Sequence, residues 1–291
     1  MKKVLPIIIL AVFLGVVVSL VTQGPEMKGP VHVAGQLKVH CVDVGQGDCI
    51  LIQTPDGRNM LVDAGGEDSA ESVVRYLVRN GVNRIDTLVI THPHTDHIGG
   101  LAKVLEQFGV ARILDAGCPH GSQTYQNVLS AIESRKIDYR LATHTAELQV
   151  GKEVDVEILW PPTGYSPAGE SGLNNGSVVM RVDYRDVSVL LAGDVQREAE
   201  GRLLASHRNL RATILKVAHH GSEDSTSNEF LQVVKPAYAV ISVGAGNPYA
   251  QPARVTLRRL AAAGARVFRT DVHGSVVFTT DGRKVEVASE K

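Results

Sequence analysis

The feature that most constrains this chain is a cluster of three histidines and one aspartate placed directly after an apolar segment. The cluster reads Thr91-His92-Pro93-His94-Thr95-Asp96-His97-Ile98-Gly99-Gly100. Residues 85–90 before it have the pattern of a buried strand, and residues 98–105 after it have the pattern of a helix opening. The cluster therefore lies on a strand-to-helix loop, where its side chains converge.

The spacing of the cluster indicates half of a two-metal site. His92 and His94 reach one cation together, while Asp96 and His97 face a second position a few ångströms away. Imidazole and carboxylate suit zinc, manganese or iron better than calcium or magnesium. The alternative is a polar loop with incidental histidines, which the total of 11 histidines in 291 residues disfavours.

Composition sets the limits of size and partner. With 291 residues, 44% of them apolar, the chain is long enough for one large α/β domain or two small ones. A formal net charge of -1 provides no overall basic field for nucleic acid, so a polyanion must be held locally. Cys41, Cys49 and Cys118 form no CxxC pair. Buried free thiols are favoured over a Cys41–Cys49 disulfide, which stays open.

The N-terminal segment differs from the remainder of the chain. Lys2 and Lys3 precede an uncharged apolar run over residues 4–21, and a polar stretch rich in Gly and Pro follows. This is typical of a secretory segment, and the run is just long enough to span a bilayer. No clean cleavage site follows, so a signal anchor is favoured over a cleaved signal peptide. We assign residues 1–22 to this segment, 23–36 to a linker and 37–291 to one domain outside the cytoplasm, either anchored in the membrane or secreted.

The pattern of short β segments and helices predicts an α/β domain. Strands are expected at 37–42, 49–54, 59–63, 85–91, 110–115, 138–142, 154–159, 177–184, 187–192 and 213–218, and helices at 69–80, 98–108, 123–134 and 196–206. Residues 161–175 read as a long loop, and a helix, a strand, a helix and two strands close the chain near Val287. Two β-rich halves of similar build predict two sheets packed face to face with helices outside.

Two further apolar strands end at residues able to bind metal. The strand at 187–192 ends in Gly193-Asp194, and a carboxylate there can bridge two ions or, alternatively, cap the following helix. The strand at 213–218 ends in His219-His220-Gly221-Ser222, a second source of ligands or, alternatively, a surface pair at a turn. Since three separate strands end in residues that can bind metal, we expect these ends to lie together at one edge of the fold and to form the active site.

These motifs resemble a known superfamily. The histidine cluster, together with Leu61-Val62-Asp63-Ala64-Gly65 and Gly193-Asp194, is similar to the metallo-β-lactamase fold superfamily. Asp43-Val44-Gly45-Gln46-Gly47-Asp48, Leu215-Lys216-Val217-Ala218-His219-His220-Gly221-Ser222, and Thr270-Asp271 with Gly274 resemble more narrowly the soluble domain of the competence protein ComEC and its free-standing relatives. The resemblance covers about residues 37–287.

The resemblance implies an αββα sandwich, made of two mixed sheets with helices outside, and a centre of two divalent ions, zinc or alternatively manganese. It assigns His92 and His94 to the first ion, Asp96, His97 and His219 to the second, and Asp194 to both as a bridge. Asp63 matches the acidic residue that supports the histidine loop without binding metal.

The chain departs from the family pattern in two places. Many members carry a further metal histidine before the Gly-Asp motif, where this chain offers only His120 and His144 in other contexts. Asn174-Asn175-Gly176-Ser177 stands at the expected position, so water or an asparagine oxygen completes the first ion's shell. Gln251 replaces the histidine of a Gly-His-Pro pattern.

The implied activity is metal-dependent hydrolysis. Asp96 and Asp194 are expected to position a metal-bridged hydroxide, and His220 to contact the substrate or protonate the leaving group, unless it only supports its neighbour. A phosphodiester is the favoured substrate, either extracellular DNA in competence or a smaller head-group ester, with β-lactams and thioesters as weaker alternatives. The basic run at 254–269 either contacts phosphates or is a solvated face. An inactive DNA-binding module at the cell surface is the other class of function.

Overall fold

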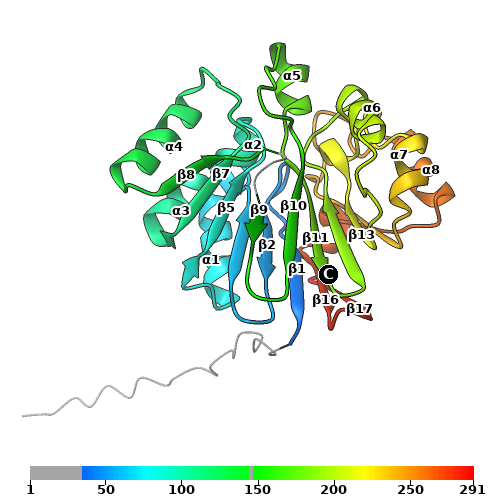
Figure 1. Cartoon of the computed structure of the whole chain (residues 1–291), viewed down its shortest axis with the longest axis horizontal. Helices are drawn as coiled ribbons and strands as arrows, with labels where there is room; N and C mark the ends of the chain where they lie inside the picture. Colours follow the sequence, from blue (N-terminus) through cyan, green and yellow to red (C-terminus); the bar gives the residue numbers. More distant parts are fainter. Residues whose placement is uncertain (1–34, 144–146) are drawn as a thin grey trace, which may run out of the picture.

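The computed structural model describes residues 35–143 and 147–291. Two mixed sheets pack face to face, and helices cover the outer face of each (Figure 1). The expected sandwich with helices outside is therefore confirmed. The predicted signal segment, residues 1–22, lies outside the described residues, as do positions 23–34 of the linker. Among the residues described, no helix is both long and apolar enough to cross a membrane.

The first sheet has eight strands in the order β17-β16-β1-β2-β3-β5-β7-β8. Its strands are β1 (Leu37–Cys41), β2 (Ile50–Gln53), β3 (Asn59–Val62), β5 (Thr87–Ile90), β7 (Arg112–Asp115), β8 (Asp138–Leu141), β16 (Val276–Thr280) and β17 (Val285–Ser289). β3, β5, β7 and β8 run parallel, so their carboxyl ends share one edge. The helices α1 (Ala70–Arg79), α3 (Leu101–Gln107) and α4 (Gln123–Ser134) cover its outer face (Figure 1).

The second sheet has seven strands in the order β15-β14-β13-β12-β11-β10-β9. They are β9 (Glu147–Gln149), β10 (Asp155–Trp160), β11 (Val179–Tyr184), β12 (Val187–Leu191), β13 (Ile214–Lys216), β14 (Tyr238–Ile241) and β15 (Arg266–Arg269). β12 to β15 run parallel. The helices α6 (Arg197–Ala205), α7 (Asn228–Val234) and α8 (Arg254–Ala262) pack outside it. A small third sheet pairs β4 (Arg84–Ile85) with β6 (Gly109–Val110).

The main core lies between the two large sheets. Val39 and Ile52 from the first sheet belong to the same buried cluster as Val182 and Val189 from the second. Burial of such aliphatic side chains contributes about 1.5–3 kcal/mol each, so the sheets are held together mainly by this layer. The thiols of Cys41, Cys49 and Cys118 are buried and free, as the sequence favoured.

The structure differs from the sequence prediction in several elements. The long loop expected at 161–175 ends in a helix, α5 (Gly169–Asn175). This segment is poor in helix formers, and tertiary contacts hold it: Leu173 is buried, and the Trp160 indole N–H donates to the Asn175 carbonyl oxygen at 2.6 Å. The strand predicted at 85–91 is divided into β4 and β5, β9 was not anticipated, and three strands rather than two follow the last long helix.

His40 on β1 gives a prediction about acid stability. The side chain is 2% exposed, and burial, helped by the charge of Lys38, lowers its pKa to about 3. The unfolded chain binds a proton at this imidazole near pH 6.5, whereas the folded chain does so only near pH 3. Stability is therefore lost as pH falls from 6.5 toward 3, by on the order of 2 kcal/mol at pH 5.

His40→Gln is expected to remove this component. Urea unfolding at pH 7.5 and pH 5 measures it as the change in unfolding free energy between the two conditions. The change should be smaller in His40→Gln than in the wild type. Equal changes in the two proteins would show that this imidazole has no part in acid unfolding.

Candidate metal centre

The three predicted ligand loops meet at one edge of the sandwich. His92 follows β5 of the first sheet, Asp194 follows β12 of the second, and His220 lies in the single-turn helix η2 (Ala218–Gly221) after β13. Because these strands contribute their carboxyl ends, the loops converge. A hydrogen bond of 2.9 Å from Val178 N to Thr91 O joins the two sheets at this edge.

One carboxylate oxygen lies at the centre of the cluster. The Oδ2 atom of Asp194 is 3.2 Å from His97 Nε2, 3.4 Å from His220 Nε2 and 3.8 Å from His92 Nε2. Asp96 Oδ2 lies 3.3 Å from His220 Nε2 and 3.9 Å from His97 Nε2. These atoms form two overlapping ligand groups, one of His92, His97 and Asp194 and one of Asp96, His97 and His220, while Asp48 and Asp63 form a third group on the other side of His97. This is the arrangement that a bridged pair of ions requires.

The donor atoms of the cluster fit a metal. His97 Nε2, His220 Nε2 and Asp194 Oδ1 are buried and make no hydrogen bond. A buried polar atom without a partner costs about 1–3 kcal/mol, and a bound cation would remove that cost. Nitrogen and carboxylate donors in this proportion suit zinc.

Neighbouring groups fix the orientation of two imidazoles. His97 Nδ1 lies 2.7 Å from Asp63 Oδ2, and the same carboxylate accepts hydrogen bonds from the Thr91 hydroxyl and amide. His220 Nδ1 donates to the Ser242 carbonyl oxygen at 2.9 Å. In both rings the proton is on Nδ1, which leaves the Nε2 lone pair for a cation. Asp63 therefore supports the histidine loop from outside, in agreement with its predicted place.

The structure brings His220, and not His219, into the ligand cluster. Both residues adopt left-handed backbone conformations, with φ of 48° and 52°, so their adjacent side chains point in different directions. The His220 side chain is 2% exposed and points at Asp96 and Asp194. The His219 side chain is 20% exposed, and its Nδ1 lies 3.5 Å from Asp224 Oδ1. The sequence analysis expects His219 to bind the second ion, whereas in this geometry its neighbour His220 lies among the other predicted ligands.

His94 lies beside the cluster, with one ring nitrogen facing His92 and the other facing Glu170. Its Nδ1 is 3.0 Å from His92 Nε2, and its Nε2 is 2.9 Å from the exposed carboxylate of Glu170. The ring of His120 is 6.1 Å from that of His94. His144 lies outside the described residues. The sequence analysis expects His94 to bind the first ion; its Nδ1 lies beside His92 Nε2, although no ligand group found within the described residues includes it.

The carboxylates set the charge state of the cluster. Burial lowers the pKa of His220, but Asp194 and Asp96 outweigh it and raise that pKa to about 10. Burial likewise lowers the pKa of His97, and Asp194, Asp96 and Asp63 together raise it well above the usual range. Burial, reinforced by His97, holds the pKa of His92 well below the usual range. Positive charge is therefore favoured around Asp194, whether it is carried by protons or by cations.

Beneath the cluster lies a buried ion pair that the sequence interpretation missed. Lys216 Nζ is 2.7 Å from Asp48 Oδ2, and both side chains are almost fully buried. Asp48 Oδ1 lies 3.7 Å from His220 Nδ1. The preceding Gly47 packs so closely that a Cβ there would come within 1.9 Å of Asp96 O. The signal was available, since Lys216 is a charged residue inside an otherwise apolar strand.

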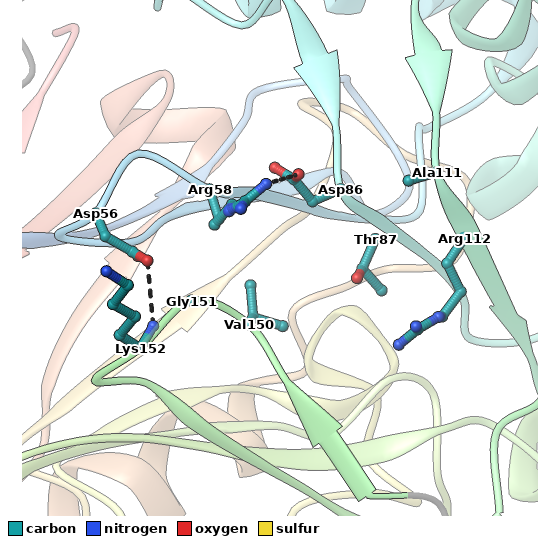
Figure 2. A pocket seen from close by; sticks show the side chains of 9 residues that line it. All are labelled: Asp56, Arg58, Asp86, Thr87, Ala111, Arg112, Val150, Gly151 and Lys152. Atoms are coloured by element: carbon teal, nitrogen blue, oxygen red, sulfur yellow. Dashed lines mark hydrogen bonds and ion pairs between the residues drawn. The ribbon is translucent and has the colours of Figure 1, made fainter.

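The cluster opens into a cavity of about 460 Å³. Its lining is almost entirely polar: Gln46, His94, Thr95, Asp96, His120, Glu170, Asn174, Asp194, His219, His220, Tyr249 and Gln251. Figure 2 shows a different cavity, of about 340 Å³, at the amino ends of β5 and β7. There Arg58 pairs with Asp86 at 2.9 Å, and none of the predicted site residues lines it. The polar cavity at the carboxyl ends is the candidate active site.

This fold and this site define a class. Residues 42–245 match the model of the metallo-β-lactamase superfamily, and the chain belongs to that superfamily. The chain has a metal-dependent hydrolase fold, and the predicted resemblance to ComEC-like competence proteins is confirmed as well.

Three relatives place the chain more closely. It is 30% identical over 263 residues to ComE operon protein 3 of Bacillus subtilis, covering 84% of this chain and 33% of that protein. It is 33% identical over 239 residues to competence protein ComA of Neisseria gonorrhoeae, covering 81% and 31%. It is 30% identical over 178 residues to ribonuclease Z of Mycobacterium avium, covering 52% and 61%. The chain therefore spans about a third of the length of these competence relatives.

Proposed function

We propose that this protein is a metal-dependent phosphodiesterase that cleaves nucleic acid outside the cytoplasm. The observation that carries the proposal is Asp194 Oδ2, which lies within 3.8 Å of three imidazole nitrogens at the floor of a polar cavity. Two divalent cations held there would lower the pKa of a bound water and neutralise charge on a phosphoryl oxygen.

Each residue of the cluster has a part in this proposal. His92, His94 and Asp194 would hold the first ion, and Asp96, His97 and His220, together with Asp194, would hold the second. Asp96 and Asp194 also accept hydrogen bonds from the attacking water and so orient it. His220 replaces His219 as a ligand, which leaves His219, on the cavity wall, to contact the substrate.

The choice of a phosphodiester rests on the relatives and on the cavity. Competence protein ComA and ribonuclease Z carry names that refer to DNA uptake and to RNA cleavage, and both align with this chain. The cavity is lined mainly by polar and titratable residues around the candidate metal centre, and bound cations there would attract an anionic ester. Residues 1–22 would place the domain outside the cytoplasm, anchored or secreted.

A DNA-binding module without hydrolytic activity is the second candidate. Gln251 favours it, because this side chain accepts from Gln46 Nε2 at 2.8 Å and donates to His219 O at 3.2 Å. A carboxamide is not an acid, so Gln251 cannot supply the proton that a histidine could give to a leaving group. In this second candidate function, the metal centre binds a phosphate of DNA but does not hydrolyse the ester efficiently.

Metal analysis combined with a substrate panel tests the proposal. We expect purified protein to carry about two divalent ions per chain and to cleave bis(4-nitrophenyl) phosphate and single-stranded DNA, but not a β-lactam or a thioester. Protein with a full complement of metal that binds DNA and cleaves no phosphodiester would support the binding module instead.

The two adjacent histidines are expected to behave differently. His220→Ala should weaken binding of the second ion at least about 100-fold, since it removes a buried donor, whereas His219→Ala should change metal affinity by less than about tenfold. Competition with a chromogenic chelator measures both. The reverse result would restore the original assignment to His219.

Asn174 is expected to complete the shell of the first ion. Its Oδ1 atom is buried without a hydrogen-bond partner, and the residue lines the cavity together with Asp194. Asn174→Ala should lower the affinity for one of the two ions by about tenfold. Asn174→Asp keeps the oxygen and adds charge, so it should restore or raise that affinity. If both variants bind metal as the wild type does, the shell is completed by water.

A further inference from the structure

An exposed aromatic side chain stands at the mouth of the active-site cavity. Tyr249 is 67% exposed, more than any other large apolar side chain in residues 35–143 and 147–291. It lines the same cavity as Asp96, Asp194 and His220. Keeping an aromatic ring in water forgoes the stabilisation that burial would give, and this ring does so beside the candidate metal centre.

The backbone that carries this ring is tied to the site. Asn247 Oδ1 accepts hydrogen bonds from the amides of Tyr249 and Gln251, both at 3.1 Å, and Asn247 Nδ2 donates to Gly244 O at 2.9 Å. Gln251 in turn donates to the carbonyl oxygen of His219 at 3.2 Å. The ring is therefore presented on a preorganised loop next to the histidine pair, and little ordering is needed on binding.

A row of cations begins where this loop ends. Arg254 is the first residue of α8, and Arg258 follows one helical turn later on the same face. Both are exposed, and neither forms an ion pair with any part of the chain that the structure describes. Arg259 donates to Glu223 O at 3.0 Å, which fastens the helix to the segment after His220. The loop that presents the aromatic ring at the cavity therefore leads directly into a helix that carries two cations without ion-pair partners in the described residues.

We propose that Tyr249 is a stacking platform for an unpaired nucleobase, and that Arg254 and Arg258 contact the phosphates that follow it. The inference rests on the proposed phosphodiesterase function and narrows its substrate to single-stranded nucleic acid. Stacking on one aromatic face accepts any base, while backbone phosphates supply charge for the arginines. In a duplex the bases are stacked on one another and paired, so the ring has no free face to meet.

Oligonucleotides with and without bases test the proposal on the metal-loaded protein. Binding is followed by rapid mixing, before cleavage, through the quenching of a 2-aminopurine base and the anisotropy of an end label. We expect the wild type to bind a 12-nucleotide single strand about tenfold more tightly than an abasic strand of equal length. Tyr249→Ala should abolish both this preference and the quenching, and Tyr249→Phe should keep them. Tyr139→Ala, an exposed tyrosine of β8 that does not line the cavity, serves as a matched control and should also keep them.

Several results would overturn the proposal. Equal affinity of the wild type for the abasic strand, or a Tyr249→Phe variant as weak as Tyr249→Ala, would show that no base stacks on the ring. Equal affinity for a fully paired duplex would show that the site does not select single strands. Comparing the affinities for DNA and RNA strands of the same sequence shows which of the two nucleic acids the site prefers. Wild-type protein that cleaves bis(4-nitrophenyl) phosphate without any preference for bases refutes the stacking alone. A preference for bases without any cleavage refutes the proposed hydrolysis and leaves the stacking.

Discussion

Asp194→Ala is expected to lower phosphodiester cleavage by about 10³-fold or more and to release metal. Its carboxylate lies within 3.8 Å of His92, His97 and His220, so both candidate ions lose a ligand and the link between them. Two bridged ions supply several kilocalories per mole of transition-state stabilisation, and each 1.36 kcal/mol is about a factor of ten in rate. Initial rates with bis(4-nitrophenyl) phosphate and metal content by plasma mass spectrometry measure the two effects.

A matched control distinguishes loss of the metal centre from general loss of folding. Asp183→Ala removes a half-buried carboxylate of β11 that is far along the sheet from the cluster, and it should leave both metal content and rate close to wild type. Circular dichroism on heating shows whether Asp194→Ala remains folded. A folded Asp194→Ala protein with two ions and the wild-type rate is incompatible with the proposed centre.

The architecture followed from short-range patterns in the sequence. Apolar strands alternated with amphipathic helices, and three strands ended in histidine or aspartate, so the edge where Asp96 and Asp194 meet could be predicted. The supporting place of Asp63 followed from the family resemblance, and its contacts to Thr91 and His97 agree with it.

The features that the sequence could not predict depend on the direction of side chains and on contacts between distant elements. The choice between His219 and His220 turns on two consecutive left-handed backbone conformations, which no local pattern encodes. Helix α5 forms because Leu173 and Asn175 find partners in other elements, and Asn175 Oδ1 accepts from the amide of Gln196 at 3.0 Å near the start of α6. The apolar pattern around Lys216 identified the strand, but it gave no indication that Asp48 neutralises the lysine.

Lys216→Met is expected to lower the free energy of unfolding by about 3–5 kcal/mol, the cost of leaving a buried charge without its partner. Lys216 Nζ lies 2.7 Å from Asp48 Oδ2, and the two side chains are 1% and 2% exposed. Natural domains are stable by only about 5–15 kcal/mol, so this change is a large part of the total. Urea unfolding of the metal-free protein measures it without a contribution from bound ions.

Two comparison variants make the cause specific. Arg58→Met breaks an exposed pair of similar length, 2.9 Å from Asp86, and should cost about 1 kcal/mol or less. Lys216→Met combined with Asp48→Leu removes both charges and should recover much of the loss. If the double variant is no more stable than Lys216→Met, the loss arises from packing and not from the stranded carboxylate.

The same pair connects stability to the metal centre. Asp48 Oδ1 lies 3.7 Å from His220 Nδ1, the ring that donates to Ser242 O and turns its Nε2 toward Asp96 and Asp194. Without Lys216, the unneutralised carboxylate would attract the Nδ1 proton of His220 away from that carbonyl. Lys216→Met should therefore weaken metal binding as well as folding, whereas the double variant should regain stability and metal affinity together. Recovery of stability alone would mean that Lys216 holds the sheet and has no influence on the centre above it.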